Sequence, residues 1–168
     1  MAGKKPVTDV SEHIHQETNK GIVINLVING AIAYATMHDL TQMSTWGGRG
    51  YGYDLITTGF FLCAILAGIF IPLYRSKCTK NEIIPGAKER QALAWLLPYN
   101  PWLTVLLIAL AGGALAAVIL LVLLDALHVE LLSPLAYAGI KAVWAAVLAG
   151  IVIPITIRQG LREPPSKD

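Results

Sequence analysis

The sequence predicts an all-α integral membrane protein, built as a bundle of four transmembrane helices. More than half of its 168 residues are apolar, and only 14% are charged, whereas a soluble domain carries about a quarter. The charges gather in short segments between long apolar runs. A helix needs about 20 residues to cross the hydrocarbon core. Four runs meet this length, and we place the spans at about 21–40, 55–74, 102–124 and 132–157.

The spans divide the chain into three parts. Residues 1–20 form a polar N-terminal segment, residues 21–157 the four-helix transmembrane domain, and residues 158–168 a polar tail. Both terminal segments are expected to be cytoplasmic. Within the longest connection, residues 88–97 are predicted to form a short surface helix whose apolar side, at 95–97, faces lipid.

The first span admits a second interpretation, because Ala33-Tyr34-Ala35 resembles a signal-peptidase cleavage site. The long charged lead and two asparagines within the apolar run argue against a signal peptide. The segment 38–54 that follows is glycine-rich, and each glycine costs a helix about 1 kcal/mol relative to alanine. It is therefore predicted to be a loop, with its aromatic residues at the membrane–water boundary.

The basic residues predict the orientation of the bundle. With four spans the two ends share one side, and that side then holds eleven of the thirteen lysines and arginines. The opposite loops hold only Arg49, and Lys141 lies within a span. The positive-inside rule therefore predicts both termini in the cytoplasm, and we expect a bacterial inner (cytoplasmic) membrane.

The second and fourth spans contain an apparent repeat. Residues 66–72 read LAGIFIP and residues 148–154 read LAGIVIP, a match at six of seven positions. Residues 30–33 resemble residues 113–116 at nearly the same spacing. These matches predict two parallel-related helical hairpins, with a pseudo-twofold axis along the membrane normal. The alternative is a chance match, since apolar helices use few residue types.

Small residues in these two spans suggest how the helices pack. Residues four apart lie on one helix face, and small side chains there let two helices approach closely. We therefore expect the second and fourth spans to cross at the centre of the bundle. Two prolines are expected to kink or end the helices, each removing one backbone hydrogen bond. The predicted packing residues are Ala64, Gly68, Pro72, Ala138, Ala142, Ala146, Gly150 and Pro154.

Asn25 and Asn29 are polar residues on one face of the first span. An amide near the membrane midplane is costly unless it meets protein or water. One interpretation is that they contact a substrate or ion in a cavity. The other is that they form hydrogen bonds that fix helix packing.

Lys141 is the one ionisable residue clearly inside a span. Its candidate partners at the outer side are Asp54, Asp125 and Glu130. It could instead bind an anionic headgroup or take part in proton coupling. The alternative to all of these roles is snorkelling, in which the aliphatic stem carries the ammonium group to the interface.

The sequence contains no recognisable catalytic motif, so we expect no enzymatic activity. Cys63 lies in an apolar run and Cys78 in a basic loop. Two single thiols of this kind do not make a CxxC redox pair. His13 and His15 lack companion ligands for a metal. We therefore predict no metal, no cofactor and no nucleic-acid partner.

Two functions remain for such a chain. The first is a transport-related protein, permease- or channel-like, that acts as an oligomer in the lipid bilayer. The alternative is a non-catalytic accessory or assembly subunit of a larger membrane complex. A common cavity lined by Asn25, Asn29 and Lys141 would favour transport, whereas separate burial of these side chains would favour the subunit.

Overall fold

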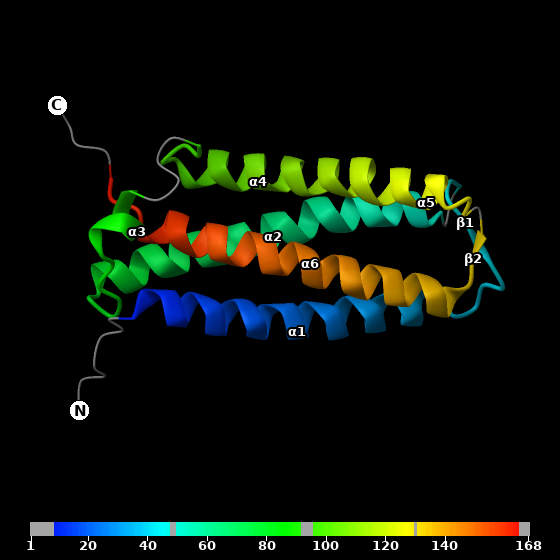
Figure 1. The fold of residues 1–168 in the computed structure, drawn as a ribbon, viewed down its shortest axis with the longest axis horizontal. Helices are drawn as coiled ribbons and strands as arrows, with labels where there is room; N and C mark the ends of the chain where they lie inside the picture. Colours follow the sequence, from blue (N-terminus) through cyan, green and yellow to red (C-terminus); the bar gives the residue numbers. More distant parts are fainter. Residues whose placement is uncertain (1–8, 48–49, 92–95, 130, 165–168) are drawn as a thin grey trace.

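The protein is a bundle of long helices lying side by side (Figure 1). The computed structural model describes residues 9–47, 50–91, 96–129 and 131–164. Its long helices are α1 (Val10–Met37), α2 (Tyr51–Thr79), α4 (Pro101–Leu115) and α6 (Pro134–Leu161). The third of these continues through η1 (Ala116–Leu121) and α5 (Val122–Ala126).

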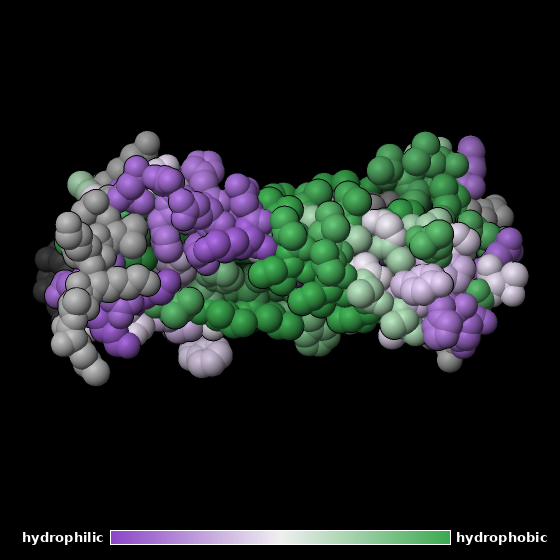
Figure 2. All heavy atoms as spheres, turned by 90° about the horizontal axis from the view of Figure 1, so that it is seen from below, coloured by the Kyte–Doolittle hydropathy of each residue, from purple (hydrophilic) through white to green (hydrophobic). Residues whose placement is uncertain are grey.

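Among the described residues, four helical stretches are long and apolar enough to cross a membrane, which is the number that the sequence predicts. They are Val10–Met37, Tyr51–Thr79, Pro101–Ala126 and Pro134–Leu161. Figure 2, seen from the α1 side, shows an apolar belt between two more hydrophilic ends. The belt is the surface that hydrocarbon would cover, because apolar side chains gain nothing from contact with water.

Three of the helices begin before the predicted spans, whereas α1 ends at Met37, short of residue 40, and α6 begins at Pro134, after residue 132. Capping residues explain where α1 and α6 start. Asp9 accepts a hydrogen bond from the Glu12 backbone, so α1 begins at Val10 and includes much of the polar segment expected to precede it. Ser133 caps α6 in the same way, and Pro134 occupies its first turn. A capping side chain supplies an acceptor for backbone N–H groups that the first helical turn leaves without partners.

The third span is not a uniform α-helix. Its middle section, η1, is a π-helix, in which the backbone turns are wider than in an α-helix. Short π-helical sections are rare and often occur near functional sites. The apolar sequence of this span does not predict the change, because its residues suit either geometry.

The helices pack in the order α4, α2, α6, α1 (Figure 1). The central position of α2 and α6, expected for the second and fourth spans, is found. Pro72 and Pro154 lie inside these two helices, which continue to Thr79 and Leu161. The prolines therefore do not end them.

The small-residue stripe of α6 packs against α1. A Cβ atom added to Gly30 would lie 3.0 Å from the Ala142 Cβ, and one added to Gly150 would lie 3.3 Å from the Ile22 side chain. Ala138 and Ala146, in the same stripe, are buried. The stripe thus serves helix packing, although its partner is α1 rather than the expected α2.

Gly68, of the predicted Ala64–Gly68 pair of α2, makes no such contact with the described residues. Gly68 is exposed, and a Cβ added there would meet no atom within 4 Å. The close contact of α2 with α4 lies instead at Gly59, where an added Cβ would be 2.6 Å from the Gly112 carbonyl oxygen. Sequence spacing identified a small pair on the wrong face of α2, because spacing does not reveal which face meets a neighbour.

Short elements cover the two ends of the bundle. At one end β1 (Met43–Ser44) pairs antiparallel with β2 (Leu131–Leu132). At the other, α3 (Ala87–Gln91) covers the start of the surface helix predicted at 88–97, whereas residues 96–97 form a turn and a bend and not a helix. Residues 92–95 of that prediction lie outside the described residues. The chain enters α1 and leaves α6 at this second end, where it has both termini (Figure 1).

Candidate functional site

A buried ion pair joins the two central helices near the β1–β2 end. Lys141 of α6 is only 6% exposed, and its Nζ donates a hydrogen bond of 2.6 Å to Oδ2 of Asp54 on α2. The Tyr137 hydroxyl, one helical turn away, donates to the same oxygen. A lysine placed this deep is costly unless an opposite charge accompanies it, and Asp54 provides that charge.

Asp54 was one of three predicted partners for Lys141. Asp125 makes no ion pair with it, and Glu130 lies outside the described residues. The snorkelling alternative is not what the structure has, since the ammonium group is directed to a carboxylate and is buried. Because α6 packs directly against α2, the Lys141 side chain can reach Asp54.

Tyr51 links this ion pair to the end of the bundle. Its hydroxyl donates a 2.6 Å hydrogen bond to the Val129 carbonyl and lies 2.6 Å from the Thr45 hydroxyl oxygen. Its ring centroid is 6.3 Å from that of Tyr137. The loops before α2 and after α5 are therefore tied to the same side chain that packs beside the ion pair.

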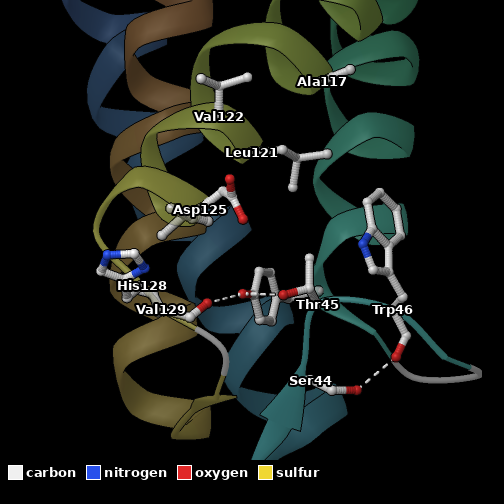
Figure 3. Close-up of a pocket in the computed structure, with 11 residues that line it drawn as sticks. Ser44, Thr45, Trp46, Ala117, Leu121, Val122, Asp125, His128 and Val129 are labelled. Atoms are coloured by element: carbon white, nitrogen blue, oxygen red, sulfur yellow. Dashed lines mark hydrogen bonds between the residues drawn. The ribbon is translucent and has the colours of Figure 1, made fainter.

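An open pocket of about 690 Å³ lies beside Tyr51 (Figure 3). Its walls come from the 44–46 segment and from the η1–α5 section of the third span. Asp125, Trp46 and His128 bring a carboxylate, an indole and an imidazole to it. Among the described residues, the Asp125 carboxylate has no hydrogen-bond or ion-pair partner.

The sequence analysis named Asp125 as one of three candidate partners for Lys141 and did not identify this pocket. The sequence does not show which distant residues come together, and Trp46 and Asp125 are far apart in sequence and meet only in the folded bundle. The glycine-rich composition around Trp46 indicated an irregular loop there, and this loop forms one wall.

Asn25 and Asn29 form a separate polar group on α1. The Asn25 side-chain amide donates to the Gly21 carbonyl at 2.8 Å, and that of Asn29 donates to the Asn25 carbonyl at 3.0 Å. Both bonds stay within the helix. Neither asparagine lines the pocket beside Tyr51, and no hydrogen bond joins either one to Lys141 in the described chain. The three candidate contact residues are thus divided between two places.

The residues that the structure describes contain no group of three His, Cys, Asp or Glu side chains that could hold a metal ion. Cys63 and Cys78 are free thiols. Comparison with protein-family models, with curated proteins and with solved structures finds no match to this chain.

Proposed function

We propose that this chain is a non-catalytic accessory or assembly subunit of a larger membrane complex. The observation that carries the proposal is the internal pairing of the three side chains predicted to contact a solute, Asn25, Asn29 and Lys141. Lys141 is satisfied by Asp54 and the asparagine amides by their own helix. The Lys141–Asp54 pair holds α6 against α2, and neither this pair nor the asparagine amides present an unpaired charge to a passing solute.

The exposed face of α1 offers a surface for a partner. This helix packs mainly against α6, and Val23, Ile24 and Val27 are each more than half exposed. In a membrane such a face meets either lipid or another helix. A subunit with one peripheral helix can join neighbouring chains without rearranging its own central pair.

The orientation belongs to the same proposal. The end that carries the chain termini also carries Arg75, Lys77, Arg158 and Arg162, whereas the β1–β2 end has the acidic residue Asp125. The positive-inside rule then favours cytoplasmic termini in a bacterial inner membrane.

A two-hairpin repeat is also supported by the packing order. A twofold axis that exchanges α2 with α6 also exchanges α1 with α4, and α1 packs on α6 as α4 packs on α2. Equivalent positions make these contacts. A Cβ added to Gly30 would meet the Ala142 Cβ, and one added to Gly113 would lie 3.4 Å from the Phe60 Cβ. These contacts relate residues 30 to 113 and 60 to 142, close to the sequence spacing of the repeat.

Photo-crosslinking in native membranes tests the subunit proposal. A photoreactive residue at Val27, exposed on α1, is expected to give a discrete adduct with another membrane protein or a second copy. The matched control is Ala33, buried on the same helix, which should give no adduct to another chain. Adducts to lipid alone at Val27 and at further exposed α1 positions would contradict the proposal.

The pocket beside Tyr51 supports a second candidate, a permease- or channel-like protein that acts as an oligomer. Its specific feature is a carboxylate, Asp125, without a partner beside a π-helical section. This function predicts proton or potassium flux in proteoliposomes above that of protein-free vesicles. Flux should fall in Asp125→Asn but not in Asp9→Asn, which removes a carboxylate at the opposite end. Flux equal to empty vesicles would exclude transport of these two ions.

A further inference from the structure

A second open cavity, of about 470 Å³, lies at the end of the bundle that carries the chain termini. It lies between the last turn of α2, the loop 81–85 and the end of α6. Three arginines and one carboxylate are the charged residues that line it, so its net charge is positive: Arg75, Arg90, Arg162 and Glu163.

Two of these arginines are held by neutral groups. Arg75 donates from Nη2 to the Tyr99 carbonyl at 2.6 Å, and Arg162 donates from Nη1 to the Leu97 carbonyl at 2.5 Å. Their guanidinium carbons lie 4.3 and 5.9 Å from the Tyr99 ring centroid. These contacts orient both groups without neutralising either charge, and a guanidinium has five N–H donors in all.

Arg75 also has a donor that the chain leaves unsatisfied. Its Nε is buried and has no hydrogen-bond partner. A buried polar atom normally has a partner, and an orphan next to a polar cavity is explained by a ligand or ordered solvent. Arg75 lines the cavity with this donor unsatisfied, and a guanidinium is suited to oxyanions, which accept two parallel hydrogen bonds.

The third arginine already has an anionic partner. Arg90 donates to the Glu163 carboxylate, and its Nε donates to the Pro85 carbonyl at 3.1 Å. Both side chains of this ion pair are about half exposed, at 43% and 57%. A solvent-exposed ion pair is worth little, so an anion in the cavity can compete with Glu163 for Arg90.

Apolar side chains accompany this basic cavity. Ile84 lines it and is 47% exposed. Leu96 and Trp102, on either side of Tyr99 in the chain, are 57% and 81% exposed. Trp102 lies in the first turn of the third candidate membrane span, which would place the cavity where headgroups meet hydrocarbon. An amphiphile with a phosphate and an acyl chain fits both features.

We propose that this cavity binds a phosphate group, supplied by the headgroup of an anionic phospholipid. Arg75 and Arg162 are the principal donors, and Tyr99 fixes their positions. Basic pockets between helices at a membrane surface are suited to such headgroups. The proposal is independent of the proposed function, since a subunit or a transporter would bind the lipid alike.

Thermal unfolding of the purified full-length chain in detergent micelles tests the proposal. Added phosphatidylglycerol is expected to raise the unfolding temperature more than phosphatidylcholine at the same concentration. Arg162→Gln should weaken the apparent affinity for phosphatidylglycerol about tenfold, the range of a hydrogen bond to a charged group. The matched control is Arg158→Gln, which removes the same charge from an exposed position on the same helix.

The outcomes separate the sources of the phosphate. Stabilisation by phosphatidylglycerol but not by inorganic phosphate supports the lipid headgroup, whereas equal stabilisation by inorganic phosphate supports the phosphate site but overturns the lipid as its source. Equal losses in Arg162→Gln and Arg158→Gln, or equal affinity for the two lipids, would overturn the site. Glu163→Gln provides a second variant that keeps all arginines, and about threefold tighter binding is expected because it frees Arg90.

Discussion

α6 and α1 pack against each other, but they differ in the hydrogen-bond partners of the polar side chains in their apolar parts. α6 buries Lys141, Thr156 and Gln159. Lys141 bonds to α2, and Gln159 donates to the Pro98 carbonyl at 2.6 Å, in the segment that leads into α4. The asparagines of α1 bond only within their own helix. The central helix therefore uses Lys141 and Gln159 to bond to neighbouring segments, whereas its Thr156 hydroxyl donates within α6. On α1 a bond to another helix is found at His13, whose Nε2 lies 2.9 Å from the Tyr74 hydroxyl, and the asparagines of its apolar part bond only locally.

This difference follows from position in the bundle. α6 has neighbours on two sides, so Lys141 and Gln159 find partners outside their own helix. α1 has α6 on one side, and most of its apolar residues are exposed. A polar side chain facing lipid must then satisfy its hydrogen bonds locally. Substitutions in α6 should thus affect stability more than substitutions in α1.

The largest effect is expected for Lys141→Met. This change leaves the Asp54 carboxylate without its cation, and a half-broken buried pair typically costs 3–5 kcal/mol. Because the Asp54 side chain is 30% exposed, we expect about 2–4 kcal/mol. Chemical unfolding in detergent, followed by tryptophan fluorescence, measures the change in the free energy of unfolding.

Lys20→Met is the control, since Lys20 is paired with Glu17 at an exposed site on α1. It should change stability by less than about 1 kcal/mol. The double variant Asp54→Asn/Lys141→Met should recover part of the loss, because it removes both charges. Equal stability of Lys141→Met and wild type would show that the Lys141–Asp54 ion pair does not stabilise the packing of α6.

A smaller effect is expected for Gly160→Ala, which tests apolar contact at the other end of α6. An added Cβ would lie 2.7 Å from the Tyr74 Cβ and 2.9 Å from the Ile71 carbonyl oxygen, where neither neighbour can move freely. Overpacking of this kind costs about 1–3 kcal/mol. Gly139→Ala, on the same helix but with no atom within 4 Å, should be neutral or stabilising. Similar losses in both variants would indicate a helix effect rather than contact with α2.

The sequence predicted the features that follow from composition. The number of spans, the placing of α2 and α6 in the centre and the packing role of the α6 stripe all depend on apolar length and residue size. Helix ends were predicted less well, because the charged residues after Asp9 continue a helix as readily as they form a surface segment. The sequence did not predict the π-helical section, because this change in backbone geometry requires no particular residue type.

The candidate sites required the folded chain. Asp54 was named as a partner of Lys141, but only as one of three, because the sequence gives no distance between loops. The two pockets join residues far apart in sequence, such as Trp46 with Asp125 and Arg75 with Arg162. Whether Asn29 meets a ligand or its own helix depends on the side-chain conformation, which periodicity does not provide.

Asn29→Leu should have the smallest effect of these substitutions and tests the α1 side of the comparison. The Asn29 amide bonds to the carbonyl one turn earlier, and such intramembrane hydrogen bonds contribute about 0.6 kcal/mol on average. Leucine adds apolar surface at a half-buried position, so the net change should stay within about 1 kcal/mol. Thermal unfolding of this variant beside Asn19→Leu, an exposed asparagine on the same helix, measures it. A large loss confined to Asn29→Leu would mean that Asn29 bonds to another chain or a solute, and α1 would then share the bonding role assigned here to α6.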